Sequence, residues 1–303
     1  MIFNRKFALG FCGFVLLLIA ALAMAHLGLY GWTLFIVLPV IAGGLAACIR
    51  RPATVGRAVR LGAIVGAMGC CIFLVVGAEG LICVAMALPV VVPLSVAGSL
   101  LAYWGDAPAR GKQPAVMTLL IPAFMLFDVN AKPPVYSVAT SIVVNAAPPR
   151  VWKNVVAFPA IEDQPDWVLR TGLAYPIRTA IGGSGVGASR SCVLSTGAVR
   201  ERVVVWNEPS LLRFVVTQTP PPMREMGLYG PIHPRHLDGY YISQAGQFEL
   251  TPLPGGRTLV VGTSWYRHGL WPAAYWRWWS DAVIHRIHER VLRHIRYLSE
   301  HGA

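Results

Sequence analysis

Three polar residues near the C-terminus have the types and the spacing that proton transfer requires. Asp281, His285 and His288 stand at positions i, i+4 and i+7, so a helix would set a carboxylate and two imidazoles in a row on one face. A carboxylate that orients an imidazole is an arrangement used for general acid-base catalysis. The alternative is structural, because buried histidines often only bond a backbone carbonyl. Asp281, His285 and His288 are therefore the catalytic candidates if the protein is an enzyme.

A second polar group lies further upstream. His233 and His236 are three residues apart, with Asp238 and Glu225 nearby in the sequence. Such residues bind zinc when they converge. Pro234 disfavours a regular helix at this point, and no third fixed ligand is in view. A loop of ordinary polar residues is the favoured interpretation, so neither a metal nor a cofactor is expected.

Large aromatic side chains crowd the segment just before Asp281, His285 and His288. Five rings fall within residues 271–279, more than one buried stripe of a helix can hold. Some of them are expected to close the mouth of a cavity or to rest at the level of lipid headgroups, and the others to pack in the core. An inward-facing arginine on a strand could also pair with a ligand carboxylate. The ligand-binding candidates are Trp276, Trp279, Ile284, His288, Arg190 and His236.

The elements that must position these residues divide the chain into a membrane half and a soluble half. The 303 residues are 55% hydrophobic and only 13% charged, with a mean hydropathy of +0.55, too apolar for an ordinary soluble domain. A helix needs about 20 apolar residues to cross a bilayer. Four runs approach that length, and a fifth, Ala115–Phe127, reaches it only with its flanking residues. The four runs are Phe7–Leu27, Tyr30–Ile49, Val59–Ala78 and Leu81–Trp104.

Basic residues in the short loops predict the orientation of these runs. Cytoplasmic loops carry an excess of Lys and Arg, and the turns near Gly28 and Gly80 carry none. If the fifth run crosses, residues 132–303 lie outside the cytoplasm; if it lies in the interface, they stay cytoplasmic. We expect an integral protein of bacterial inner-membrane type with the C-terminal half outside. The basic loop residues are Arg5, Lys6, Arg50, Arg51, Arg57, Arg60, Arg110 and Lys112.

The spans lack the buried ionisable groups that a transporter or channel needs at depth. Only His26 and Glu79 lie near span ends, so a packed helical anchor is the favoured interpretation. The net charge of +12 does not indicate nucleic acid, because no basic groove interleaved with aromatic residues follows from the sequence. The expected partners are the lipid bilayer and a hydrophobic small molecule or lipid, and protein partners stay open.

From Val135 onward the hydrophobic period changes from helical to alternating, which predicts strands. A short helix is expected at Val151–Phe158 and a long one at Trp271–Ser299. The long helix carries an apolar stripe, Ile284, Ile287, Val291, Leu292, Ile295 and Leu298. Arg286, Arg290 and Arg293 fall on the opposite face, which is expected to be solvated; the alternative is that it is attracted to anionic lipid. The predicted strands are Val135–Val144, Tyr175–Gly182, Ala188–Thr196, Val199–Trp206, Leu211–Thr219, Tyr240–Thr251 and Thr258–Arg267.

This order predicts an α+β protein with two domains. Residues 1–130 would form a bundle of four to five transmembrane helices. Residues 131–303 would form an antiparallel sheet whose apolar face the last helix must cover.

Four motifs stand out in the soluble half: Ala147–Trp152, Gly185–Ala188, Trp206–Pro209 and Phe248–Leu250 followed by Pro254–Thr258. Together with the long terminal helix, they resemble the START-like or SRPBCC superfamily, which includes polyketide cyclases and dehydrases and lipid-transfer proteins. The resemblance covers roughly residues 135–300 and implies a helix-grip fold, in which a curved sheet wraps the last helix and leaves a hollow for an apolar ligand. The superfamily shares no fixed catalytic triad, so no catalytic residue carries over. The insert Pro220–Leu237 departs from the pattern and is expected to form a lid.

The sequence leaves three functional hypotheses. The first is a membrane-anchored START-like domain that binds a hydrophobic small molecule or lipid at the bilayer surface. The alternative is a polyketide cyclase or dehydrase-type enzyme that uses His288 or His285 as acid or base, with Asp281 orienting the imidazole. The third is an assembly module of a membrane complex, which would enclose no hollow at all.

Overall fold

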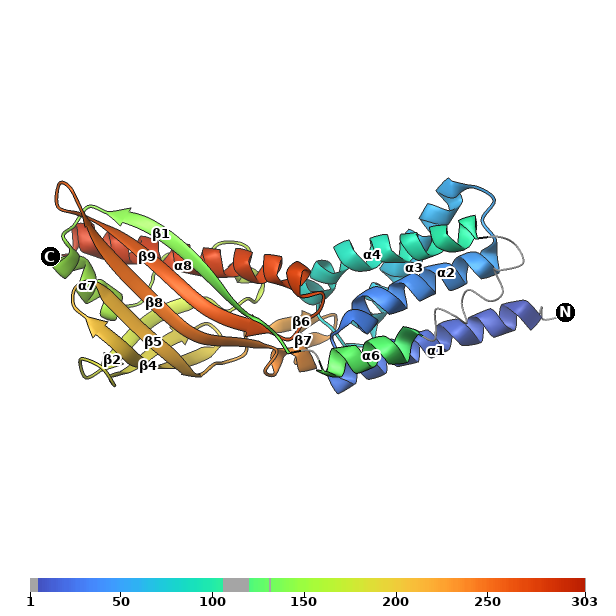
Figure 1. Cartoon of the computed structure of the whole chain (residues 1–303), viewed down its shortest axis with the longest axis horizontal. Coiled ribbons are helices and arrows are strands. Elements are labelled where there is room, and N and C mark those ends of the chain that lie inside the picture. The colour runs from blue at the N-terminus through green and yellow to red at the C-terminus, as the bar shows by residue number, and fades with distance from the viewer. Residues whose placement is uncertain (1–4, 106–119, 131, 303) are drawn as a thin grey trace. The chain divides into compact units, whose positions relative to one another are not determined.

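The computed structural model describes residues 5–105, 120–130 and 132–302. It contains two compact units (Figure 1). The helical unit contains residues up to Lys132 together with two later segments, Glu225–His236 and Leu270–Pro272. The helix-grip unit contains Pro133–Arg224, Leu237–Gly269 and the chain from Ala273.

Among the described residues of the helical unit, four helices are long and apolar enough to cross a membrane. They coincide with the four apolar runs of the sequence, because a continuous apolar stretch without charge satisfies its backbone only as a helix in lipid. The second span begins with a π-helical turn, η1 (Thr33–Val37), that continues into α2. The helices are α1 (Arg5–Leu27), α2 (Leu38–Arg50), α3 (Val55–Val75) and α4 (Leu81–Trp104).

Glycines set the close packing of α2, α3 and α4. A Cβ atom at Gly43 of α2 would overlap the backbone carbonyl of Ser95 in α4, and one at Gly98 of α4 would overlap the carbonyl of Val40. The hydroxyl of Ser99 also donates to the carbonyl of Ala58 in α3, at 2.8 Å. Small residues that let backbones approach are typical of helix packing in membranes, where the hydrophobic effect does not drive association.

The helical unit has two chemically different ends. We call the end with the loop Arg50–Thr54 the basic end, and the end with the loops 28–32 and 76–80 the acidic end. The two acidic-end loops meet directly, because the hydroxyl of Tyr30 donates to Glu79 Oε1 at 2.5 Å. Helix α4 starts beside Glu79 and therefore ends, at Trp104, on the basic end.

The described part of the fifth apolar run contacts the acidic end. This part is helix α6 (Leu120–Asn130); residues 115–119 of the run lie outside the described residues. The carboxylate of Asp128 accepts from the backbone N–H groups of Trp32 and Thr33, at 2.8 and 3.0 Å, and from the hydroxyl of Thr33 at 2.8 Å. Asp128 of α6 thus lies at the acidic end, whereas Trp104, the last residue of α4, lies at the basic end.

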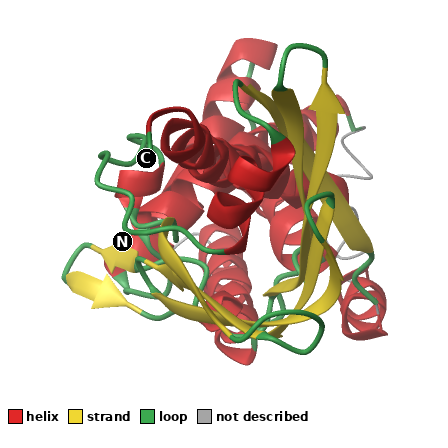
Figure 2. Cartoon of the chain, turned by 90° about the vertical axis from the view of Figure 1, so that its left-hand side faces the viewer, coloured by secondary structure: helices red, strands yellow, loops and turns green. Residues whose placement is uncertain are grey.

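Within the described residues of the helix-grip unit, seven strands form one antiparallel sheet in the order β1-β9-β8-β5-β4-β3-β2. The sheet curves around the last helix, α8 (Ala273–His301), so that both edge strands contact it (Figure 1, Figure 2). This is the helix-grip arrangement that the sequence predicted. The strands are β1 (Val135–Val144), β2 (Pro176–Gly182), β3 (Ser189–Leu194), β4 (Gly197–Asn207), β5 (Leu211–Gln218), β8 (Tyr241–Leu253) and β9 (Arg257–His268).

The core of this unit lies where α8 and the short helix α7 (Pro148–Val156) cover the sheet. The predicted apolar stripe of α8 is confirmed: Leu292 and Ile295 are fully buried in the core. The prediction for Arg290 is wrong, because its side chain is buried and donates to the carbonyls of Pro176 and Ile161, at 3.1 and 3.3 Å. Its guanidinium thus has two backbone oxygens as hydrogen-bond partners, as a buried polar group requires.

The insert Pro220–Leu237 does not form the expected lid. Its residues Glu225–His236 pack with the helices as part of the helical unit. They form a short hairpin, β6 (Glu225–Gly227) and β7 (Gly230–Ile232), followed by a 3-10 turn, η3 (Arg235–Leu237). Strand β6 contacts α4. The sequence predicted a domain boundary between residues 130 and 131, and the structure has it between Lys132 and Pro133. It also adds Glu225–His236 and Leu270–Pro272 to the helical unit.

Candidate functional site

The helix-grip unit has a cavity of about 140 Å³ between α8 and the concave face of the sheet. Ile287 and Val291 line it from α8, while strands β2, β3, β4, β5, β8 and β9 supply most of the remaining wall. The long helix therefore does not fill the hollow of its sheet. The sheet and loop residues of the wall are Phe158, Pro176, Thr179, Arg190, Cys192, Leu194, Val199, Glu201, Phe214, Val216, Ser243, Ala245, Gly246, Phe248 and Ser264.

A buried ion pair lies in this largely apolar wall. Arg190 and Glu201 face each other across β3 and β4, so strand register brings them together. Their side chains are 3% and 6% exposed and form a direct ion pair, and Arg190 Nε also donates to the carbonyl of Val156 at 3.2 Å. The guanidinium stacks over the ring of Phe214, at 4.5 Å from its centre. Burial raises the pKa of Glu201, and the charge of Arg190 opposes that shift.

A chain of hydrogen bonds leads from the cavity wall toward solvent. The hydroxyl of Ser264, which lines the cavity, lies 2.7 Å from His288 Nε2. His288 Nδ1 lies 3.0 Å from the hydroxyl of Thr140, which in turn lies 2.8 Å from Nδ1 of the exposed His285. If Thr140 donates to His285, then it accepts from His288 Nδ1, and His288 Nε2 is the acceptor for Ser264. One tautomer of His288 thus makes it a base toward a hydroxyl of the cavity.

His288 is uncharged at neutral pH. Burial lowers the pKa of its imidazole to about 4, and the neighbouring His285 acts in the same direction. A neutral imidazole can accept a proton, which is the state a general base needs.

Among the described residues, Asp281 forms its hydrogen bonds with partners other than His285 and His288. Its Oδ1 accepts from the hydroxyl of Tyr266 at 2.5 Å, and its Oδ2 accepts from Arg277 Nε at 3.1 Å. The i, i+4 spacing to His285 is present, but Thr140 and Ser264 hold the imidazoles. Burial, together with the hydrogen bond to Asp281, raises the pKa of Tyr266 above its ordinary value. Asp281 therefore links the N-terminal part of α8 to strand β9.

The predicted ligand-binding residues fall in several places. Arg190 lines the cavity, and His288 reaches its wall through Ser264. Trp276, Trp279 and Ile284 are not among the residues that line this cavity; Ile284 packs instead with Val138 and Tyr266. His236 lies in the helical unit.

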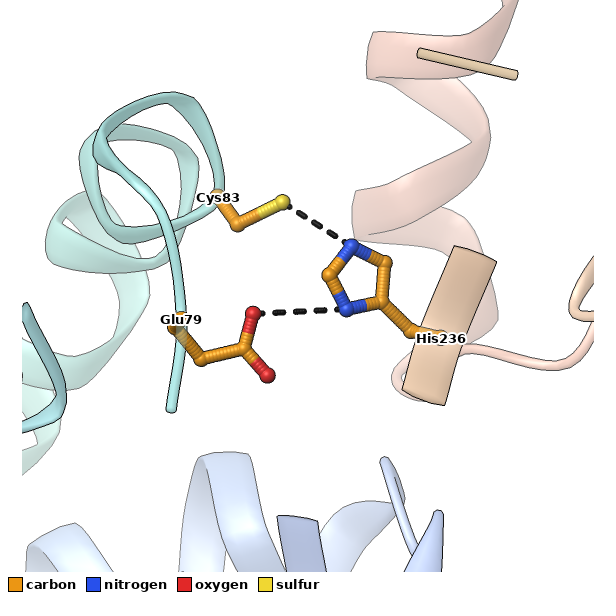
Figure 3. Close-up of side chains that lie close together, drawn as sticks. All are labelled: Glu79, Cys83 and His236. Atoms are coloured by element: carbon orange, nitrogen blue, oxygen red, sulfur yellow. Dashed lines mark hydrogen bonds and ion pairs between the residues drawn. The ribbon is translucent and has the colours of Figure 1, made fainter. Parts of the chain in front are cut away.

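His236 belongs to a second buried polar cluster, with Glu79 and Cys83 (Figure 3). Its Nδ1 lies 3.3 Å from Glu79 Oε2, and its Nε2 lies 3.0 Å from Cys83 Sγ. Glu79 precedes α4, Cys83 lies in the first turn of α4, and His236 comes from the turn η3. The imidazole thus points between the carboxylate and the thiol, all at the acidic end of the helices.

Sequence reasoning missed the hydroxyl and carboxylate partners of these sites. Thr140, Ser264 and Glu201 are ordinary strand residues in the sequence. Alternation along β4 does predict that Glu201 shares the inward side of Val199 and Val203, which is an unusual place for a carboxylate. That inward carboxylate was the available signal for the buried pair.

Comparisons with known proteins support no functional argument. No protein-family model matches the sequence, and neither does any curated protein. A protein from Nitrosospira multiformis is 18% identical with a TM-score of 0.35, over 54% of this chain and 95% of that one. Truncated norcoclaurine synthase from Thalictrum flavum is 11% identical with a TM-score of 0.36, over 57% and 99%. A protein from Chromobacterium violaceum is 13% identical with a TM-score of 0.32, over 54% and 96%. The helix-grip assignment therefore rests on the strand order and on α8 of this chain.

The buried neutral His288 predicts a specific loss of stability in acid. Its folded pKa of about 4 lies below the ordinary value of 6.5, so the unfolded chain binds the proton more tightly between these values. The contribution of neutral His288 to the free energy of unfolding is complete above pH 6.5 and is lost as the pH falls toward 4. This loss amounts to at most about 3 kcal/mol. In thermal unfolding of the full chain in detergent, we expect His288→Asn to lose less stability than wild type over this range. His301→Asn, at an exposed position of the same helix, should behave as wild type. An equal pH dependence in all three proteins contradicts the assignment.

Proposed function

We propose that this chain is a membrane-anchored helix-grip protein whose C-terminal domain binds a small hydrophobic molecule, or the apolar end of a lipid, near the bilayer. The observation that carries the proposal is the cavity between α8 and the sheet. Four long apolar helices support the anchor. Binding of this kind agrees with the START-like resemblance of the sequence motifs, and membership of that superfamily is part of the proposal.

The size of the cavity limits the ligand. A dry cavity of about 150 Å³ holds one benzene molecule, whereas pockets for drug-sized ligands begin at about 300 Å³. A volume of about 140 Å³ thus suits one ring or a short stretch of acyl chain. We infer that a larger ligand would insert only one end.

The polar atoms of the wall favour a ligand with one polar group. The Arg190 and Glu201 pair, the thiol of Cys192 and the hydroxyl of Ser264 lie among phenylalanine and valine side chains. Burial raises the pKa of the Cys192 thiol to about 11, so it stays protonated and can donate weakly. A few polar groups in an apolar pocket fix the orientation of a ligand, while the apolar wall provides affinity.

Filling the cavity from β4 tests ligand binding. Val199 is buried and lines the cavity, whereas Val204 on the same strand is exposed. Native mass spectrometry of the detergent-solubilised chain should detect a retained apolar compound in wild type and in Val204→Phe. Val199→Phe should lose most of it, because the added ring takes ligand volume. Thermal unfolding of both variants checks that they are folded. Equal retention by the two folded variants, or no retained compound in wild type after incubation with lipid extract, refutes the proposal.

A second candidate function is proton transfer on a bound ligand, an enzyme of the cyclase or dehydrase type. The chain from Ser264 through His288 and Thr140 to His285 supports it, since it links the cavity wall with an exposed imidazole. His288 would take a proton, by way of Ser264, from the ligand. Asp281 would contribute only by holding α8, since its oxygens bind Tyr266 and Arg277.

Conversion of the retained compound separates an enzyme from a binding protein. The compound would be extracted and incubated with wild type, Ser264→Ala and His288→Gln, and its mass followed over time. An enzyme should convert it in wild type, and each variant should slow conversion by about 10²-fold or more while still retaining the compound. No mass change with wild type would exclude this candidate and leave the binding function intact.

We further propose that the basic end of the helices faces the cytoplasm and that the helix-grip domain lies outside it. Arg50 and Arg51 carry the positive charge typical of cytoplasmic loops. Asp128, on the helix that precedes the domain, lies at the other end.

Reporter fusions test this orientation. A phosphatase that folds only outside the cytoplasm should be active when fused after Ala303 and inactive when fused after Thr54. Inactivity at both positions, with a cytoplasmic fluorescent reporter active at both, would remove the extracytoplasmic placement. That outcome would leave the proposal of ligand binding in the cavity unchanged.

A further inference from the structure

The acidic end of the helical unit contains three groups of the kinds that bind zinc. Glu79, Cys83 and His236 each offer one ligand atom, and these atoms all lie within 4.8 Å of one another (Figure 3). Bond lengths of 2.0–2.3 Å in a tetrahedral zinc site place ligand atoms roughly 3.3–3.7 Å apart. Cys83 Sγ lies 3.0 Å from Nε2 of His236, whereas Glu79 Oε2 lies 3.3 Å from Nδ1, the other ring nitrogen. One ion binds only one of these nitrogens, so binding requires a small rotation of the imidazole or of the Glu79 side chain.

The cluster is rich in acidic groups and has little to balance them. Glu79 is 7% exposed, and Glu225, whose Oε1 accepts from the backbone N–H of Cys83 at 3.0 Å, is 1% exposed. In the part of the chain that the structure describes, no Lys or Arg forms an ion pair with either carboxylate. Buried charge is costly unless it is paired or bound to a metal.

Buried polar atoms that lack hydrogen bonds point to the same place. Glu79 Oε2, Glu225 Oε2 and His236 Nδ1 have no hydrogen-bond partner among the described residues. The contact between His236 Nδ1 and Glu79 Oε2 is close enough for an ion pair, but it does not have hydrogen-bond geometry. Native proteins rarely leave such atoms without a partner.

Surrounding contacts hold the candidate ligands in position. The hydroxyl of Tyr30 fixes the other oxygen of Glu79 at 2.5 Å, and the ring of Tyr30 packs edge-on against His236. Gly80 lets Glu225 approach α4, because a Cβ there would overlap the Glu225 side chain. Outer partners of this kind orient the ligands of metal sites.

We propose that Glu79, Cys83 and His236 bind one Zn²⁺ ion and so fasten the segment Glu225–His236 to the start of α4. Thiolate and imidazole ligands favour zinc over the hard ions Mg²⁺ and Ca²⁺. Binding releases the thiol proton to solvent, and the two charges of the ion then balance the thiolate and the Glu79 carboxylate. Three protein ligands leave one tetrahedral position for a water molecule.

Zinc analysis of the full chain tests the site. The protein would carry an affinity tag without histidine and be purified in detergent, incubated with equimolar ZnCl₂ and desalted. Elemental mass spectrometry should find about one zinc per chain in wild type. In Cys83→Ser and in His236→Ala, the zinc bound per chain should fall at least about tenfold. Cys71→Ser, at an exposed thiol of α3, is the matched control and should keep it.

A spectroscopic measurement covers the case in which a variant does not fold. Wild type incubated with CoCl₂ should show a thiolate-to-cobalt absorption band, and Cys71→Ser should show the same band. The proposal is overturned if wild type shows no such band, or if folded Cys83→Ser binds as much zinc as Cys71→Ser. Val199→Phe should leave the zinc content unchanged, so failure of the ligand proposal and failure of the metal proposal remain separate results.

Discussion

The curl of the antiparallel sheet about α8 is the constraint on which the cavity and its chemistry depend. Edge strands β1 and β2 both contact the helix, as does β9, the neighbour of β1 in the sheet. A flat sheet could bury its apolar face flush against a helix, whereas a strongly curved one leaves space between part of its concave face and a straight helix. The space left between them is the cavity of about 140 Å³. The apolar stripe of α8 closes that space and does not fill it.

We interpret the buried ion pair in this wall through the proposed ligand binding, because stability alone explains it poorly. Taking Arg190 and Glu201 out of water costs several kcal/mol per ion, and well-packed apolar residues often stabilise a fold as well or better. The raised pKa of Glu201 reflects this cost, because desolvation outweighs the attraction of Arg190. The stacking of the guanidinium on Phe214 holds it in one orientation. A fixed charged group that faces an apolar hollow gives a polar ligand end something to recognise.

Patterns along the chain predicted the elements well, because each depends on neighbouring residues. Alternation predicted β1 to the residue and the other long strands to within a few residues, and the stripe from Ile284 to Leu298 predicted the buried face of α8. The sites depended on contacts that the sequence does not encode locally. Thr140 is 148 residues from His288, and Cys83 is 153 residues from His236. Periodicity also placed Arg290 on the solvent side. The pattern of one helix contains no information about the distant carbonyl groups to which Arg290 donates.

The long connection between β5 and β8 supports the proposed metal site. These strands are neighbours in the sheet, and a hairpin turn of two to five residues would join them. The chain instead uses residues 219–240, and long connections of this kind usually have a function. Ordering them costs conformational entropy, and the apolar contacts of a two-stranded hairpin offset little of it. Both ends of the segment that packs with the helices carry a buried polar residue, Glu225 and His236, and both reach Cys83. A bound cation would supply at that point the interaction energy that the hairpin itself lacks.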